Sequence, residues 1–179
     1  FSFGDYLRSG AIAKFSPIMK EIIGFANAGG FVMGICNGFQ ILCETGLLPG
    51  ALLHNTDHKF ICKNIYLKTI SDNSILTNMI GDKSLKIPIA HGEGRYFAEA
   101  KTIAELETND QILFKYCNEK GEITEDSNPN GSIKNIAGVC NKDRNVFGMM
   151  PHPERATDIE LKSTNGRKLF ESILSKTLA

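Results

Sequence analysis

Cys36 lies between two glycines, Gly34 and Gly38, at the point where an apolar run gives way to the helix-compatible stretch FQILCE. This order of residues predicts a strand, a tight turn and a helix, with a thiol at the turn. Small residues on both sides suit a strained nucleophile elbow, because larger side chains there would collide with the neighbouring strand and helix. A helix N-terminus also favours thiolate over thiol. Cys36 is therefore a candidate nucleophile, and the alternative is a buried structural cysteine.

A cysteine nucleophile needs a general base and a group that orients the base. Both occur in the segment PHPE, where His152 follows an apolar strand and lies between Pro151 and Pro153. Glu154 comes two residues later, and side chains at positions i and i+2 of an extended segment point the same way. Glu154 is therefore expected to hold the imidazole in the required tautomer. A solvent-exposed polar turn is the alternative for this segment taken alone, but its combination with the cysteine elbow favours catalysis.

Two further polar segments contain side chains that could belong to a site. The segment HNTDH contains residue types that bind metal ions: His54, Asp57 and His58. It follows a Pro-Gly turn and offers no third strong ligand, so a polar loop is favoured and no metal site is predicted. The segment IAHGEGRY alternates polar and small residues after a strand: His91, Glu93 and Arg95. These residues could line a cleft or contact a partner, and an ordinary polar turn is equally compatible with them.

Apolar periodicity and turn residues predict alternating helices and strands that position these side chains. A helix begins at Ser16-Pro17 and ends at Gly29-Gly30, and the strand that follows, 31–35, is apolar enough for burial on both faces. Further strands are expected over residues 61–70, 86–90, 96–98, 111–117, 136–140 and 146–150, and further helices after Cys36 and over 102–108 and 166–176. We expect an α/β fold, a mainly parallel sheet with helices on both faces.

The composition limits the class of protein. A chain of 179 residues fits one domain, and 20 basic residues balance 20 acidic ones, so no basic field favours nucleic acid or an anionic membrane. No apolar run approaches the length of a membrane span. Five cysteines without a CxxC pair indicate a reducing, cytoplasmic setting. The cysteines other than Cys36 are expected to be core or surface thiols: Cys43, Cys62, Cys117 and Cys140.

The motifs around these residues resemble one known family. In order, they are GGFVMGICNGFQIL, LLPGALLHN, IPIAHGEGRYF, NPNGS, IAGVCN and GMMPHPERA. They resemble the class I glutamine amidotransferases and, within that class, the glutaminase subunits of phosphoribosylformylglycinamidine synthases of purine biosynthesis. The resemblance runs from Phe1 to about Phe170 and implies a flavodoxin-like fold.

The resemblance also implies roles for five residues. Cys36 would attack the side-chain amide of glutamine, and His152, oriented by Glu154, would take the thiol proton and pass one to the leaving ammonia. Water would then cleave the glutamyl thioester. The backbone N–H of Asn37 would serve the oxyanion, and Gln40 would help to hold the substrate.

Partners follow from the same resemblance. The ammonia would pass to a large synthase subunit that uses ATP and Mg²⁺ to convert formylglycinamide ribonucleotide to the formylglycinamidine ribonucleotide, and a small third subunit would complete the complex. No cofactor is expected in the present chain, which lacks a phosphate-cradling glycine loop.

Two departures from the family pattern affect these expectations. Family members carry further strands before the loop FSFGD, so the N-terminal strands of the amidotransferase domain, residues 1–179 here, are expected to be absent from this chain. His54 stands where an arginine is common, which leaves substrate contacts by His54 and Asn55 open. The alternatives are an inactive fragment, a docking-only subunit, or another cysteine hydrolase of similar fold. Peptidase-like relatives generally place histidine directly after the nucleophile, where this chain has Asn37.

Overall fold

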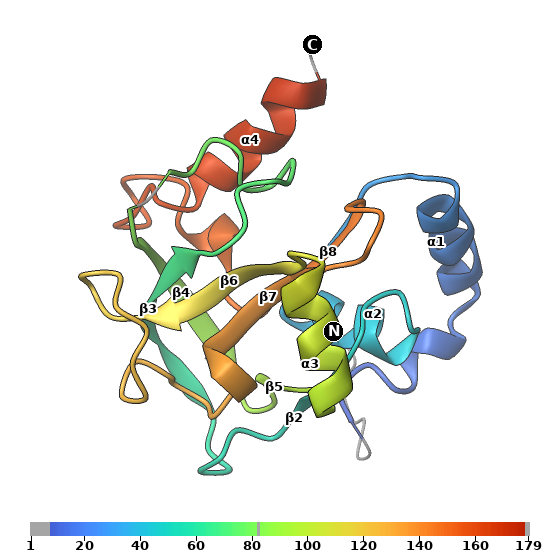
Figure 1. The fold of residues 1–179 in the computed structure, drawn as a ribbon, viewed down its shortest axis with the longest axis horizontal. Helices are drawn as coiled ribbons and strands as arrows, with labels where there is room; N and C mark the ends of the chain where they lie inside the picture. Colours follow the sequence, from blue (N-terminus) through green and yellow to red (C-terminus); the bar gives the residue numbers. More distant parts are fainter. Residues whose placement is uncertain (1–7, 82, 178–179) are drawn as a thin grey trace.

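A computed structural model describes residues 8–81 and 83–177, and the expected loop FSFGD lies outside this part. A six-stranded sheet has the order β1-β8-β7-β6-β3-β4, and β2 and β5 form a separate pair (Figure 1). The strands are β1 (Val32–Ile35), β2 (Ala51–Leu53), β3 (Ile61–Thr69), β4 (Leu85–His91), β5 (Arg95–Phe97), β6 (Ile112–Cys117), β7 (Ile136–Cys140) and β8 (Val146–Met149). The α-helices are α1 (Pro17–Asn27), α2 (Asn37–Glu44), α3 (Ala100–Thr108) and α4 (Arg167–Thr177), and the 3-10 helices are η1 (Ala13–Phe15), η2 (Ile133–Asn135) and η3 (Pro153–Arg155).

The predicted α/β class is confirmed, with one correction to the strand directions. Within the described sheet, β1 and β8 are parallel, whereas the other neighbouring strands run antiparallel. The sheet is therefore mixed and not mainly parallel. An apolar run indicates that a strand is buried, but it does not indicate whether the strand runs parallel or antiparallel to its neighbours. Short connections, such as the one between β7 and β8, join antiparallel strands directly.

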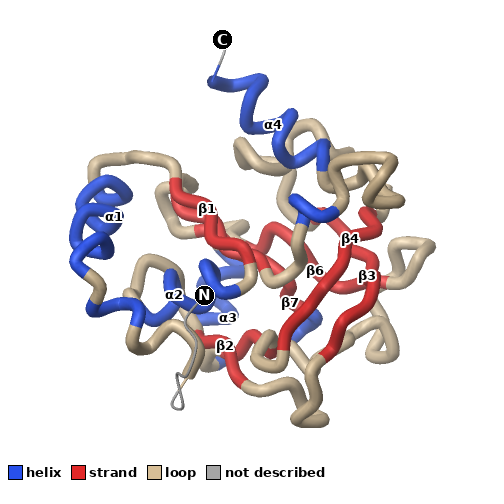
Figure 2. Tube along the Cα trace, turned by 180° about the vertical axis from the view of Figure 1, so that it is seen from behind, coloured by secondary structure: helices blue, strands red, loops and turns tan. Residues whose placement is uncertain are grey.

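Helices cover both faces of the sheet, as predicted. Phe39 of α2 and Leu106 of α3 belong to the core on one face, and Leu169 of α4 belongs to the core on the other. Neighbouring sheet residues divide between these cores, as Ile136 and Ala137 of β7 do. In Figure 2, α1 lies beyond α2, at the side of the molecule where β1 forms the sheet edge.

The strand before the candidate nucleophile differs from the expectation in its burial. β1 is an edge strand of the described sheet, and of its residues only Gly34 is buried. Phe31, directly before the strand, is 58% exposed. Burial on both faces was predicted from the apolar sequence alone, but a strand paired on one side has fewer neighbours to cover it.

Candidate active site

Cys36 occupies a strained turn between β1 and α2. Its backbone has φ 53° and ψ −106°, and its N–H donates to the carbonyl oxygen of Met149 in β8 at 2.8 Å. A positive φ at a non-glycine residue costs conformational energy and occurs preferentially at functional sites. The residue is 8% exposed, and its Sγ lies 3.9 Å from the carbonyl oxygen of Ala90 in β4. The predicted strand–turn–helix elbow is therefore present.

The two glycines that flank Cys36 differ in the space available for a side chain. A Cβ atom at Gly34 would lie 2.6 Å from the backbone carbon of Gly38 and 2.6 Å from Cδ1 of Leu42. The predicted collision thus holds for Gly34, where β1 and α2 approach closely. A Cβ at Gly38 would meet no heavy atom of the described structure within 4 Å, so the same argument was wrong for Gly38.

His152 and Glu154 form a hydrogen-bonded pair beside β4. Nδ1 of His152 lies 2.6 Å from Oε1 of Glu154, and the backbone N–H of His152 donates to the carbonyl oxygen of Pro88 at 2.8 Å. The His152 side chain is 7% exposed. Its Nε2 is buried and has no hydrogen-bond partner in the described structure. The carboxylate accepts a hydrogen bond from Nδ1–H, which leaves Nε2 as the nitrogen that can exchange a proton.

The environment favours the protonated form of this histidine. Burial opposes the charge on His152, but the interactions with Cys36 and Glu154 outweigh it and raise the pKa of His152 to about 9. Burial likewise opposes ionisation of Glu154, but the hydrogen bond from His152 holds the pKa of that carboxyl below its usual value. The pair can therefore store a proton close to the Cys36 sulfur at neutral pH.

Gln40 links α2 to the segment after β4. Its Nε2 donates to the carbonyl oxygen of Glu93 at 2.6 Å, and its Oε1 accepts from Nδ2 of Asn37 at 2.9 Å. Both ends of the Gln40 amide are thus engaged within the protein. The structure shows that Gln40 is hydrogen-bonded to Asn37 and to the backbone of Glu93. The roles of Gln40 toward glutamine and of Asn37 toward the oxyanion stay predictions.

The segment IAHGEGRY also reaches the site, although only in part. His91 is 3% exposed, and burial together with the charge of His152 lowers its pKa to about 4. The Glu93 carboxylate accepts from the backbone N–H of Ser9 at 3.0 Å and lies 3.4 Å from Nδ1 of His54. Arg95 instead donates to the carbonyl oxygen of His54 at 2.9 Å, outside the buried part of the site.

Two asparagines are buried behind this segment: Asn55, whose contact with substrate the sequence left open, and Asn130, which sequence reasoning missed. Asn55 is 0% exposed and Asn130 is 2% exposed, and both hydrogen-bond to the backbone of Gly94. Both lie in motifs that were noted, HNTDH and NPNGS, but a single sequence gives no sign that two distant turns meet at one glycine. Only the structure shows that these asparagines, which lie in polar loops, are buried.

The polar loop that was weighed as a metal site also lies near this segment. The rings of His54 and His58 are 5.7 Å apart. Across residues 8–81 and 83–177, no group of three or more His, Cys, Asp or Glu side chains is arranged to hold a metal ion. Within the same ranges, no helix has both the length and the apolar character needed to cross a membrane.

Comparison with known proteins identifies the family. The model of the CobB/CobQ-like glutamine amidotransferase domain matches residues 1–176. The chain is 58% identical over 173 residues to "Phosphoribosylformylglycinamidine synthase subunit PurQ" of Synechocystis, covering 96% of this chain and 77% of the relative. It is 53% identical to the protein of the same description in Gloeobacter violaceus, covering 100% of this chain and 78% of the relative.

A solved structure agrees with these relatives. The structure of PurLQS from Thermotoga maritima matches with a TM-score of 0.84 at 43% sequence identity, over 99% of this chain and 76% of the matched chain. The similarity thus extends over both β1 and the PHPE segment, which carry the Cys36 elbow and the His152–Glu154 pair. The chain belongs to the PurQ family of glutamine amidotransferases.

Proposed function

We propose that this chain is the glutaminase subunit of a phosphoribosylformylglycinamidine synthase and that it hydrolyses glutamine to glutamate and ammonia at Cys36. The observation that carries the proposal is the His152–Glu154 hydrogen bond of 2.6 Å, formed beside a cysteine in a strained elbow. Membership of the PurQ family supports the same reaction. A nucleophile, a base and a group that orients the base are the parts that amide hydrolysis through a thioester needs.

In the proposed reaction each of these groups has one role. The Cys36 sulfur adds to the carbonyl carbon of the glutamine side-chain amide, and the thiol proton goes to Nε2 of His152. The C–N bond then breaks, and His152 returns the proton to the nitrogen, so that ammonia leaves and a glutamyl thioester remains. Water, deprotonated by the same histidine, attacks the thioester and releases glutamate and the free thiol. Glu154 holds the imidazole in the orientation that both transfers require.

The tetrahedral intermediates carry a negative oxygen that needs hydrogen-bond donors. The backbone N–H of Asn37 is our candidate donor, since Asn37 is the first residue of α2 and directly follows the nucleophile. Gln40 is the candidate contact for the glutamine substrate, either directly or through the Glu93 carbonyl that it binds.

The ammonia is consumed by a larger partner. The solved relative is described as PurLQS, which supports association of this chain with a synthase subunit of the PurL kind. In that subunit the ammonia would convert formylglycinamide ribonucleotide to the amidine with ATP and Mg²⁺. A small third subunit would complete the assembly, and the cytoplasm, where purine nucleotides are made, would be its location.

Substitution of Cys36 tests the proposal. Cys36→Ala should abolish release of glutamate from glutamine by the chain together with its synthase partner, because no other group can form the thioester. It should also abolish labelling by a chloroketone that mimics glutamine. Cys43→Ala is the matched control, since Cys43 is a buried thiol whose pKa is raised by burial and by Glu44.

The outcomes separate the alternatives. Labelling that persists in Cys36→Ala and disappears in Cys43→Ala would refute the assignment of the nucleophile. If the unsubstituted chain bound the synthase but released no glutamate, a docking-only subunit would be indicated. Hydrolysis of peptides in place of glutamine would indicate a peptidase of similar fold.

A further inference from the structure

Residues 90–94, which end β4 and lead into β5, contact the candidate active site through their backbone. We refer to them as the 90–94 turn. The carbonyl oxygen of Ala90 lies 3.9 Å from Sγ of Cys36, and the carbonyl oxygen of Glu93 accepts from Nε2 of Gln40 at 2.6 Å. The position of this turn therefore affects both the nucleophile and the helix that begins beside it.

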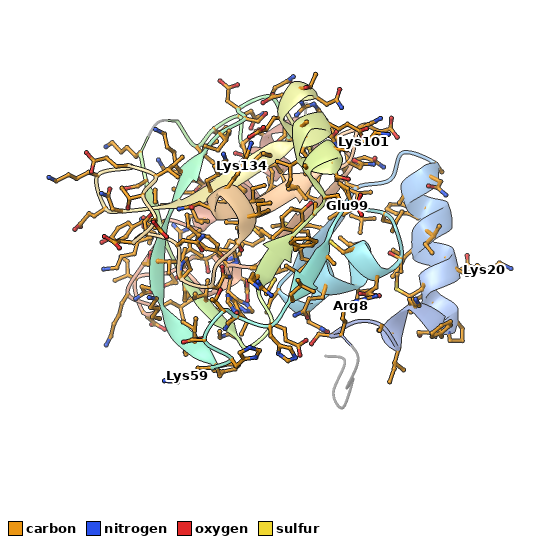
Figure 3. The ribbon with its side chains drawn as sticks, turned by 60° about the horizontal axis from the view of Figure 1, so that its bottom comes forward. Arg8, Lys20, Lys59, Glu99, Lys101 and Lys134 are labelled. Atoms are coloured by element: carbon orange, nitrogen blue, oxygen red, sulfur yellow. The ribbon has the colours of Figure 1, made fainter. Side chains whose placement is uncertain are left out.

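The buried side chain of Asn55 makes several of the hydrogen bonds that hold the turn in place. Nδ2 of Asn55 donates to the carbonyl oxygens of His91 at 2.9 Å and Lys59 at 2.8 Å. Its Oδ1 accepts from the backbone N–H of Gly94 at 3.1 Å and lies 3.1 Å from Nδ1 of His91. Asn130 donates to the carbonyl oxygen of Gly94 at 2.8 Å, so both backbone groups of that glycine are held. The side chain of Lys59, in contrast, lies at the outer rim of the molecule (Figure 3).

These contacts determine which nitrogen of His91 carries the proton. Because Nδ2 of Asn55 donates to two carbonyls, its Oδ1 can only accept, and Nδ1 of His91 must therefore donate. Nε2 of the neutral ring is then free of a proton, and it is buried without a partner in the described structure. Burial, with a smaller effect of His152, lowers the pKa of His91 to about 4. The ring thus adds no second positive charge beside His152 at neutral pH.

We propose that Asn55 is a positioning residue of the glutaminase site, which fixes the 90–94 turn against Cys36 and Gln40 and holds His91 as the neutral tautomer protonated at Nδ1. Asn55 acts through the turn and not on the substrate. The kinetic part of this proposal rests on the proposed function, whereas the tautomer of His91 follows from the hydrogen bonds alone.

Two variants of Asn55 and one control separate positioning from stability. Asn55→Ala removes the side-chain hydrogen bonds that Asn55 makes to the turn and leaves those of Gln40 and Asn130, whereas Asn55→Asp keeps the two acceptor contacts and loses the two donor contacts. Asn145→Ala is the control. Asn145 is 5% exposed and donates to the carbonyl oxygens of Ala26 at 2.7 Å and Gly30 at 2.9 Å, before β8 and away from Cys36.

The position of the proton is measured by ¹⁵N NMR of the histidine rings, which is practicable because the chain has four histidines. The His91 signal is assigned by its loss in His91→Gln. We expect protonation at Nδ1 in the unsubstituted chain and in Asn55→Asp, and a mixture of tautomers in Asn55→Ala. A purely structural role of Asn55 would leave this tautomer unchanged.

Kinetics with the synthase partner give the second measurement. We expect kcat for glutamine hydrolysis to fall about 10- to 100-fold in Asn55→Ala, as small misplacements of catalytic groups typically cause, and less in Asn55→Asp. Asn145→Ala should lower kcat little, even where it lowers Tm by as much as Asn55→Ala does. Should Asn55→Ala fail to fold, Asn55→Asp and Asn145→Asp supply the same comparison.

Either of two results would overturn the proposal. One is protonation of His91 at Nε2 in the unsubstituted chain, and the other is a loss of activity in Asn55→Ala no greater than in Asn145→Ala. A lack of glutamine hydrolysis by the unsubstituted complex would instead refute the proposed function, and the histidine spectrum would still decide the tautomer.

Discussion

At the scale of single residues, the proton shared by His152 and Glu154 links the proposed catalysis to stability. The pKa of His152 is about 9 in the folded chain although burial opposes its charge. The contribution of Cys36 to this pKa is largest when the sulfur is negative, so a proton removed from the thiol is retained on the imidazole. A histidine that holds its proton in this way is suited to deliver it to departing ammonia.

The raised pKa predicts a dependence of stability on pH. The folded pKa of His152 lies above the ordinary value of 6.5, so its contribution is fully present below about pH 6.5 and is lost as the pH rises through about 9. We expect Glu154→Gln to weaken this dependence, because it removes the charge that stabilises the imidazolium. The part of the unfolding free energy at stake is at most on the order of 3 kcal/mol. Urea denaturation between pH 6 and pH 9 measures it.

A distant carboxylate supplies the control for this prediction. Glu160 lies on the surface after η3, and Glu160→Gln changes the net charge by the same amount as Glu154→Gln. Equal pH dependence in Glu154→Gln and Glu160→Gln would contradict the proton sharing inferred from the 2.6 Å contact. Glutamine hydrolysis should fall in Glu154→Gln alone.

At the scale of elements, the close approach of β1 to α2 sets the geometry of the nucleophile elbow. Gly34→Ala should destabilise the chain by about 1–3 kcal/mol, because its Cβ would overlap the backbone of Gly38 and force the strand and helix apart. Gly38→Ala meets no such obstacle in the described structure and replaces a glycine within α2, so it should be neutral or stabilising by up to about 1 kcal/mol. Thermal unfolding of the two variants measures the difference.

The two glycines make the result decisive, because the substitutions are chemically identical and only four residues apart. If Gly38→Ala were the more damaging change, the packing of α2 on β1 described above would be incorrect. If both were harmless, the elbow would tolerate separation of the two elements.

The same elements show which features of the fold and of the site could be predicted from the sequence. The elbow at Cys36 and the Glu154–His152 contact were predictable, because both depend on residues close together in the chain. The reason given for the contact was wrong, however, because Glu154 lies in the 3-10 helix η3 and not in an extended segment. The mixed direction of the strands was not predictable. The apolar sequences of β6 and β7 suit a parallel or an antiparallel pair equally well, and contacts between residues distant in the chain decide which pair forms. The hydrogen bonds of Asn55 were equally hidden, since they join segments about 36 residues apart.

At the scale of the whole molecule, large apolar side chains are exposed beside the edge strand of the described sheet. Phe25 of α1 and Phe31 line one hollow together with Val32 of β1, and Ile18 lies about two helical turns before Phe25 on α1. We call Ile18, Phe25 and Phe31, which are 59%, 57% and 58% exposed, the α1–β1 patch. The outer edge of β1 pairs with no strand of the described residues. An edge strand with exposed apolar neighbours is a site for association with another chain.

We therefore expect the 179-residue chain on its own to self-associate through the α1–β1 patch. Phe25→Lys combined with Ile18→Lys should shift sedimentation toward the monomer, because two charges beside β1 oppose the burial of this surface. Ile159→Lys with Leu161→Lys is the matched control, since these residues are 83% and 50% exposed in the segment after η3. Sedimentation velocity over a range of concentrations measures the effect. Association that is unchanged by the α1–β1 pair, or reduced equally by the control pair, would show that another surface joins the chains.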